Sequence, residues 1–168
     1  MNMLDAKIRM AKKRLLSSEG SHAVSASGRL LGIILDSEEE ALKMPFLELQ
    51  KKLGIAEENI YFLLCGKKGP ENAIFGTAYF AAEDLSWNGR IKNGETEVFF
   101  DRSYDLLISF AASENKLAAF AVSVARAGLK VGRQSSQKCD FDLLISTDDP
   151  ELFTAELEKY LKILKTAV

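Results

Sequence analysis

Four long apolar segments lie between Arg29 and Ser146 and set the pattern of the chain. A strand that is covered on both faces has no polar face, so its sequence is apolar almost throughout instead of alternating. The four segments therefore predict buried strands of a mostly parallel sheet. They are RLLGIIL (29–35), NIYFLLC (59–65), YDLLISF (104–110) and FDLLIS (141–146).

Helical patterns separate these predicted strands. Pro45 suits the first turn of a helix that ends near Gly54. Ser113 can cap a helix rich in alanine and valine, which Gly128 would end, and Asp149 begins the last helix. The order strand, helix, strand, helix predicts a three-layer α/β sandwich of the Rossmann-like or flavodoxin-like class.

Two regions of the chain are less regular. LKVGR (129–133) predicts a further strand, but the segment QSSQKCD that separates it from FDLLIS is shorter than the dozen or so residues of a parallel crossover. We therefore expect one antiparallel strand near the C-terminus. Between Gly66 and Ser103, AIFGTAYF (73–80) fits either a strand or an extended excursion, and EVFFDR (97–102) predicts a short helix.

The N-terminus predicts a basic amphipathic helix, because lysine and arginine surround apolar residues at helical spacing. Such a helix could lie on an anionic membrane or on an acidic partner, but it more often packs on its own or a sister subunit. We therefore expect a homo-oligomer or a protein partner through this helix. Residues 17–28 are small and polar, which predicts a flexible linker and divides the chain into residues 1–28 and one α/β domain at 29–168. The apolar positions of the helix are Leu4, Ile8, Ala11 and Leu15.

Composition narrows the cellular setting. The chain has 168 residues, 47% of them hydrophobic, which is enough for one globular core. Its 22 basic and 24 acidic side chains give no electrostatic reason to expect nucleic acid as a partner. Two cysteines are too few for a disulfide framework and fit a reducing cytoplasm. Because no apolar segment approaches the roughly 20 residues that span a bilayer, we expect no membrane span.

Candidate binding residues follow the predicted strands. In an open α/β sheet, ligands bind beyond the carboxyl ends of the strands, where the strand order reverses. Asp36, Ser113 and Arg133 come at or after such ends, and together they could contact a small anion or a metal-bound phosphate. Each residue also has a purely structural explanation, as part of an acidic helix start, as a helix cap and as part of a solvated turn.

Catalytic signatures are few. His22 is the single histidine, which excludes a histidine triad or a zinc site of several histidines within one chain. The phosphate-binding patterns GxGxxG and GxxxxGK[ST] do not occur, and neither Cys65 nor Cys139 has an obvious base. We expect no cofactor and no metal. The favoured hypothesis is a non-catalytic cytoplasmic binding or regulatory module. The alternative is a domain or enzyme that binds a small anion or nucleotide-type ligand at the strand ends.

Five stretches carry a resemblance to a known family: DLSWNGRI (84–91), YDLLISF, LKVGR, DFDLLIS and the YLKIL of the closing helix. These strand and turn patterns are similar to a family of short bacterial proteins of unknown function found in the Bacteroidota. The resemblance covers most of the chain from Arg29 onward. It implies a cytoplasmic bacterial protein with an α/β fold, and it brings no established activity, cofactor or catalytic residue.

Overall fold

A six-stranded parallel sheet forms the centre of the computed structural model, which describes residues 2–17, 28–70, 76–133 and 140–166. The strand order is β3-β2-β1-β4-β5-β6, and every neighbouring pair is parallel. This is the order of doubly wound dinucleotide-binding folds, in which the direction of winding reverses between β1 and β4. The predicted α/β fold with a mostly parallel sheet is confirmed. The strands are β1 (Leu31–Asp36), β2 (Ile60–Gly66), β3 (Thr77–Ala81), β4 (Ser103–Ser109), β5 (Arg126–Arg133) and β6 (Leu143–Ile145).

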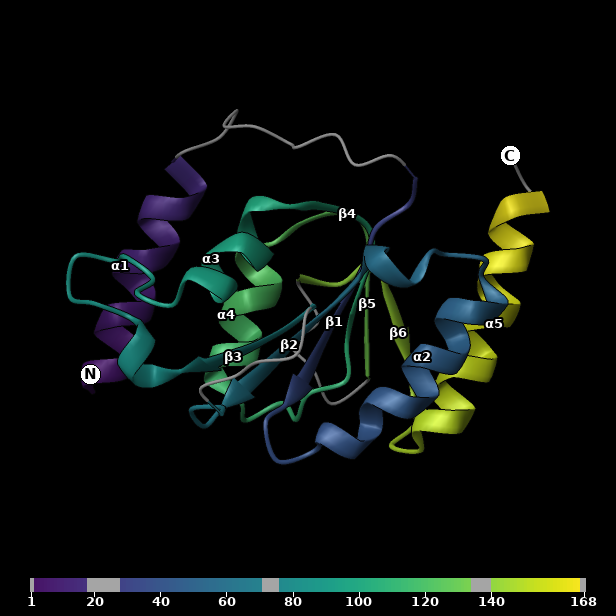
Figure 1. Cartoon of the computed structure of the whole chain (residues 1–168), viewed down its shortest axis with the longest axis horizontal. Helices are drawn as coiled ribbons and strands as arrows, with labels where there is room; N and C mark the ends of the chain where they lie inside the picture. The colour runs from purple at the N-terminus through teal and green to yellow at the C-terminus, as the bar shows by residue number, and fades with distance from the viewer. Residues whose placement is uncertain (1, 18–27, 71–75, 134–139, 167–168) are drawn as a thin grey trace.

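Helices cover both faces of the sheet (Figure 1). The helices α2 and α5 lie on one face, α3 and α4 lie on the other, and α1 packs outside α4. Among the described residues, no helix has both the length and the apolar character needed to cross a membrane. The helices are α1 (Met3–Ser17), α2 (Lys43–Lys52), α3 (Gly94–Asp101), α4 (Lys116–Val124) and α5 (Pro150–Thr166), with short 3-10 turns at Glu40–Leu42, Glu57–Asn59 and Ala82–Asp84.

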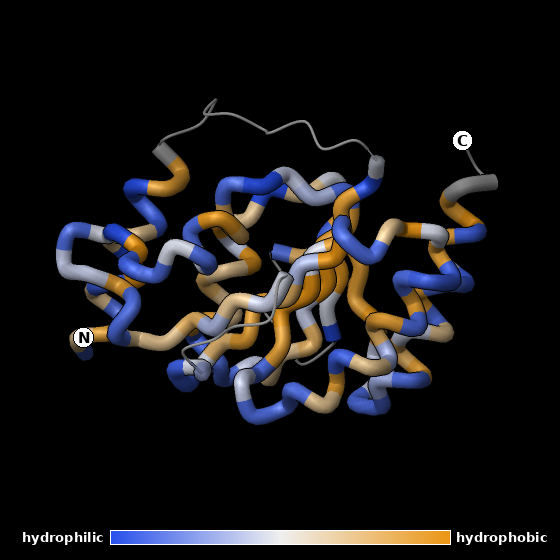
Figure 2. Tube along the Cα trace, in the orientation of Figure 1, coloured by the Kyte–Doolittle hydropathy of each residue, from blue (hydrophilic) through white to orange (hydrophobic). Residues whose placement is uncertain are grey.

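Alternate residues of each strand face opposite helix layers, so the sheet separates two cores. In β1, Leu31, Ile33 and Leu35 pack with Phe46 of α2 and Phe153 of α5. Ile34 packs on the other side, with the residues of α3 and α4. Figure 2 shows apolar residues concentrated along the central strands and hydrophilic residues along the outer helices and loops. Burial on both faces explains why the strands are apolar almost throughout.

Two aspartates at strand starts hold neighbouring strands in register. The carboxylate of Asp105 accepts the backbone N–H of Leu30 at 2.7 Å, and the backbone N–H of Asp105 donates to the Leu30 carbonyl at 3.0 Å. Asp142 makes the same pair of bonds with Lys130, both at 2.8 Å. The two similar segments YDLLIS and FDLLIS therefore enter the sheet through the same pair of hydrogen bonds.

The predicted antiparallel strand is wrong, because β6 pairs parallel with β5. Leu143 lies opposite Val131, and Ile145 lies opposite Arg133, so β6 begins beside the last third of β5. The connection at 134–142 therefore has to return only a short distance along the sheet. A full crossover past a whole strand would need more residues. Residues 134–139 lie outside the described residues.

Other predicted boundaries are confirmed or shifted. The described part of AIFGTAYF forms β3, and α3 confirms the short helix predicted near 97–102. The prediction that Ser113 caps α4 is wrong, because Asn115 Oδ1 accepts the N–H of Ala118 at 3.1 Å. Gly128 does not end this helix, because it lies within β5. There a side chain would approach the Asp105 carbonyl within 3.2 Å, which explains the glycine.

Helix α1 packs on its own chain. Ala11 is wholly buried, and Leu4, Ile8 and Leu15 pack against the same core as α4. Gly89 makes a close approach on the other side, because a Cβ there would stand 2.8 Å from the carbonyl oxygen of Met10. Most of the linker predicted at 17–28 lies outside the described residues. The apolar side of the predicted amphipathic helix is therefore covered within the chain.

Replacing Gly89 with alanine should loosen this contact. Gly89 has a φ of 82° and Gly54 a φ of 68°, so Gly89→Ala and Gly54→Ala each cost about 1 kcal/mol in backbone strain. Only at Gly89 does the new methyl group meet the backbone of α1, which adds about 1–3 kcal/mol of overpacking. Urea unfolding should therefore show a larger loss for Gly89→Ala. Equal losses for the two variants would contradict the packing of α1 described above.

Candidate functional site

Hydrogen bonds link the loops at the switch point, where the winding of the sheet reverses. Asp36, at the end of β1, accepts the N–H of Ala112 at 3.0 Å and the side-chain amide of Asn115 at 2.6 Å. The same amide nitrogen of Asn115 donates to the carbonyl of Cys65, at the end of β2, at 3.0 Å. Three loops at the carboxyl edge are thus tied together. In dinucleotide-binding folds, the ligand binds at this position. Here the carboxylate of Asp36 accepts hydrogen bonds from the protein itself.

Ser113 and Arg133 do not join Asp36. The Ser113 hydroxyl is exposed and bonds the carboxylate of Glu114 at 3.1 Å. The guanidinium of Arg133 lies 4.4 Å from the ring centroid of Phe110, which belongs to the core under α2 and α5. Asp36 instead bonds the residue that caps α4, on the opposite face of the sheet. No hydrogen bond or ion pair among the described residues joins Asp36 to Ser113 or Arg133.

A small cavity lies at this edge, among the described residues. A cavity of about 20 Å³ beside Ser113 is lined by Ala112, Ala118, Phe141 and their neighbours, and it holds no more than a water molecule. Arg133 forms an ion pair with the exposed Asp148 at 3.2 Å. The remaining residues of the predicted loop, 134–139, lie outside the described residues.

Cys65 is an unreactive thiol. It is fully buried, and burial raises the pKa of the Cys65 thiol well above its ordinary value, with a further contribution from the carboxylate of Asp36. A thiol must lose its proton to act as a nucleophile, so this environment disfavours reaction. Cys139 and His22 lie outside the described residues. Within the described part of the chain, no three His, Cys, Asp or Glu side chains gather as a metal site would require.

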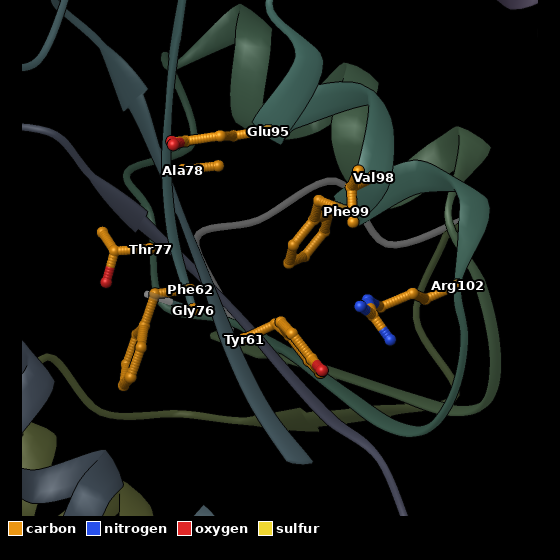
Figure 3. A pocket seen from close by; sticks show the side chains of 9 residues that line it. All are labelled: Tyr61, Phe62, Gly76, Thr77, Ala78, Glu95, Val98, Phe99 and Arg102. Carbon is orange, nitrogen blue, oxygen red and sulfur yellow. The ribbon is translucent and has the colours of Figure 1, made fainter. Parts of the chain in front are cut away.

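A larger cavity lies at the other end of the sheet, between the start of β3 and helix α3. Its volume is about 160 Å³. Figure 3 shows the side chains of Val98 and Phe99 above it, Ala78 on the strand side, and Tyr61 pointing toward Arg102. We call this space the edge cavity. It is mostly apolar, and Arg102 supplies its cation.

Stacking on Tyr61 fixes the position of Arg102. The guanidinium carbon lies 4.1 Å from the ring centroid of Tyr61, a cation–π contact. Arg102 is the residue after α3, where the chain turns into β4. Its Nε atom is buried without a hydrogen-bond partner, and no described residue forms an ion pair with its guanidinium. An arginine in this position presents N–H donors that the described protein groups do not use.

Tyr104 packs against Tyr61 and so helps to hold the stacked pair of Tyr61 and Arg102 in place. Its ring meets Tyr61 edge to face, with ring centroids 6.4 Å apart, and its hydroxyl donates to the carbonyl of Phe99 at 2.7 Å. Burial raises the pKa of Tyr104 far above its ordinary value, although the charge of Arg102 acts in the opposite direction. The hydroxyl therefore stays protonated and keeps donating at any physiological pH.

A second cation lies across the sheet from the edge cavity. Figure 3 shows Phe62 and Thr77 pointing away from Tyr61 and Arg102. On that side, Lys43 of α2 donates to the Thr77 hydroxyl at 2.7 Å and lies 5.2 Å from the ring centroid of Phe62. Burial lowers the pKa of Lys43, and the charge of Glu40 opposes this shift. An open cavity of about 510 Å³ adjoins these residues.

Nothing in the sequence pointed directly to Arg102 or Lys43 as candidate site residues. Alternation within NIYFLLC is sufficient to place Tyr61 and Phe62 on opposite faces of a strand. It does not reveal which cation stacks on each ring, because Lys43 comes from α2 and Arg102 from the residue after α3. Asn115 was also missed as the cap of α4, because Ser113, two residues earlier, is an equally good cap by residue type.

The fold and these cavities define an α/β protein with a six-stranded parallel sheet and a closed switch-point crevice. The chain belongs to a family of unknown function (DUF6913), whose family model matches residues 7–164. No curated protein and no solved structure matches the chain. The match includes most of α1 as well as the sheet, so the resemblance to a family of unknown function is confirmed.

The bond between Asp36 and Asn115 should contribute to folding. Asp36→Ala and Asn115→Ala remove its two partners, and Asn115→Ala also removes the cap of α4. In urea unfolding, we expect a coupling free energy of about 1–3 kcal/mol between the two substitutions, because the bond is charge-assisted. Ser113→Ala is the matched control and should change stability by less than about 0.5 kcal/mol. Strictly additive losses would show that the two side chains do not interact.

The amine of Lys43 should titrate below the ordinary lysine value of 10.5, because burial disfavours its charged form. The folded protein then releases this proton at lower pH than the unfolded chain does. The contribution of Lys43 to stability should therefore rise with pH through the interval below 10.5, and the difference in stability between the unmodified protein and Lys43→Met should show this rise. NMR of the lysine Cε resonances measures the titration, and Lys43→Met assigns the signal. A midpoint at or above 10.5 would refute the expected effect of burial.

Proposed function

We propose that this protein is a non-catalytic binding module that holds a small molecule in the edge cavity. The observation that carries the proposal is the guanidinium of Arg102, which lines an apolar cavity of about 160 Å³ and has no hydrogen bond or ion pair to a described residue. Binding pockets in proteins are mostly apolar, with a few polar groups that orient the ligand. The edge cavity has this composition.

Binding without catalysis fits the groups around the cavity. Tyr61, Glu95 and Arg102 are its ionisable lining residues, and Tyr61 is engaged by stacking. Thr77 also lines the cavity, but Figure 3 shows it pointing away from Arg102, and its hydroxyl accepts a hydrogen bond from Lys43 on the other side of the sheet. The alternative is a ligand site or enzyme at the carboxyl edge, built on Asp36, Ser113 and Arg133. There Asp36 already accepts two hydrogen bonds from the protein, from Ala112 and Asn115.

The proposal also includes a setting and a partner. A cytoplasmic location is supported by the buried free thiol of Cys65, which suits a reducing compartment, and a bacterial origin is what the resemblance described above implies. Association through α1, with a sister subunit or another protein, would have to use the outward side of this helix. Arg9 and Lys13 lie exposed there, together with the exposed apolar side chains of Met3 and Met10. The inward side is occupied by the contact with α4.

Val98→Trp tests whether the edge cavity binds ligands. Val98 is 46% exposed at its rim, so an indole there should cover the opening without disturbing the core. Glu97→Trp is the matched control, because Glu97 is exposed on the same helix but does not line the cavity. With fragments of one ring, amide NMR shifts should centre on Tyr61, Ala78 and Phe99 in the unmodified protein and in Glu97→Trp. They should be lost in Val98→Trp.

The outcomes of this screen separate the two hypotheses. Shifts that centre on Ser113 and Arg133, and that persist in Val98→Trp, would favour the carboxyl edge and contradict the proposal. Equal losses in the two tryptophan variants would show that blocking is not specific to the cavity. Amide dispersion in each variant, recorded without fragment, confirms that the fold is retained.

A further inference from the structure

We propose that the ligand of the edge cavity is a compact apolar monocarboxylate whose carboxylate pairs with the guanidinium of Arg102. This inference rests on the proposed function and adds the chemical class of the ligand. Its three supports are the charge of Arg102, the size and lining of the cavity, and the acidic residue at the far end. Each support gives one property of the ligand.

The charge of Arg102 calls for an anion. The guanidinium is charged at every accessible pH and carries five N–H donors in a planar fork. Stacking on Tyr61 covers one face of this plane and uses none of the donors. A carboxylate can accept two parallel N–H bonds from such a fork, which makes it the best-matched small acceptor.

No described side chain supplies that carboxylate. Glu95 lines the same cavity, but Figure 3 shows it at the opposite end from Arg102, and the two residues form no ion pair. The orientation of Arg102 is already set by Tyr61, which Tyr104 supports in turn. A ligand therefore meets a guanidinium that is held in place, and little side-chain entropy is lost on binding.

Size and lining define the rest of the ligand. A volume of about 160 Å³ is close to that of an apolar cavity of about 150 Å³ that holds benzene. Ala78, Val98 and Phe99 line the space with hydrocarbon, and the ring of Tyr61 closes one side. One ring or one branched chain fills this volume, so the apolar part of the ligand is limited to that size.

The ligand should carry a single negative charge. Arg102 is the one cation among the described lining residues, and Glu95 brings a negative charge to the same cavity. A dianionic phosphate would leave charge unmatched by Arg102 and would be repelled by Glu95. A monocarboxylate is fully matched by one guanidinium. This distinction separates carboxylates from phosphate esters of the same shape.

Benzoate, benzamide and phenyl phosphate test these steps, because they share a ring and differ in the charged group. Amide NMR titration measures the dissociation constant of each with the full-length protein. We expect benzoate to bind about tenfold to a hundredfold more tightly than benzamide, the range of a charge-assisted bidentate pair. Phenyl phosphate should bind more weakly than benzoate. The shifted amides should lie around Tyr61, Ala78 and Phe99.

Variants of Arg102 assign the effect to this side chain. Arg102→Met should remove the preference for benzoate over benzamide and leave benzamide binding unchanged. Arg102→Lys keeps the charge without the fork, so it should retain only part of the preference, and it serves as the second variant if Arg102→Met does not fold. Arg9→Gln is the control, because Arg9 is exposed on α1, and it should bind all three probes like the unmodified protein.

Failure of this inference and failure of the proposed function give different results. Equal binding of benzoate and benzamide at the edge cavity would overturn the carboxylate assignment and leave the binding module intact. Tighter binding of phenyl phosphate would overturn the single negative charge. A preference for benzoate that persists in both Arg102 variants would overturn the role of Arg102. No shift around the cavity with any probe would overturn the inference and the proposed function together.

Discussion

A carboxylate at the start of a strand sets the register of this sheet, and the two-sided core depends on that register. Asp105 holds Leu30 by two hydrogen bonds just before β1 and β4 begin to pair. A slip of one residue would turn every side chain of a strand to the opposite face. In a sheet covered on both sides, such a slip would mismatch both cores at once. Asp142 gives the same constraint to β6, which is only three residues long.

The same constraint reaches the edge cavity. Beside the Asp105 pair, the ring of Tyr104 packs against Gly32, where a Cβ would stand 2.9 Å from Cδ1 of Tyr104. The position of that ring determines where Tyr61 can pack, and Tyr61 in turn carries the guanidinium of Arg102. A hydrogen bond that fixes strand pairing therefore also orients the cation of the proposed site. Phe141 packs against Gly132 in the same way at the other end of the sheet.

The sequence allowed the sheet to be predicted but not the site. Apolar segments located the strands because burial on both faces leaves a pattern that needs no knowledge of neighbours. The direction of β6 was missed because loop length alone does not show that this strand begins beside Val131 rather than beside the start of β5. Asp36 was found as a polar residue at a strand end, but its partner Asn115 is 79 positions away. Arg102 was missed for the same reason, since its partner Tyr61 lies on β2, far from it in the sequence.

The balance of hydrogen bonds explains why a ligand would favour the edge cavity over the switch point. A ligand that displaced Asn115 or Ala112 from Asp36 would leave a polar group without its partner, at a cost of about 1–3 kcal/mol if that group stayed buried. An anion there would also meet the negative charge of Asp36. At the edge cavity, the donors of Arg102 are not matched by described protein groups, so a carboxylate can bind without breaking a protein hydrogen bond. On the proposal made above, the residues that stabilise the fold at the carboxyl edge leave the opposite end of the sheet as the binding site.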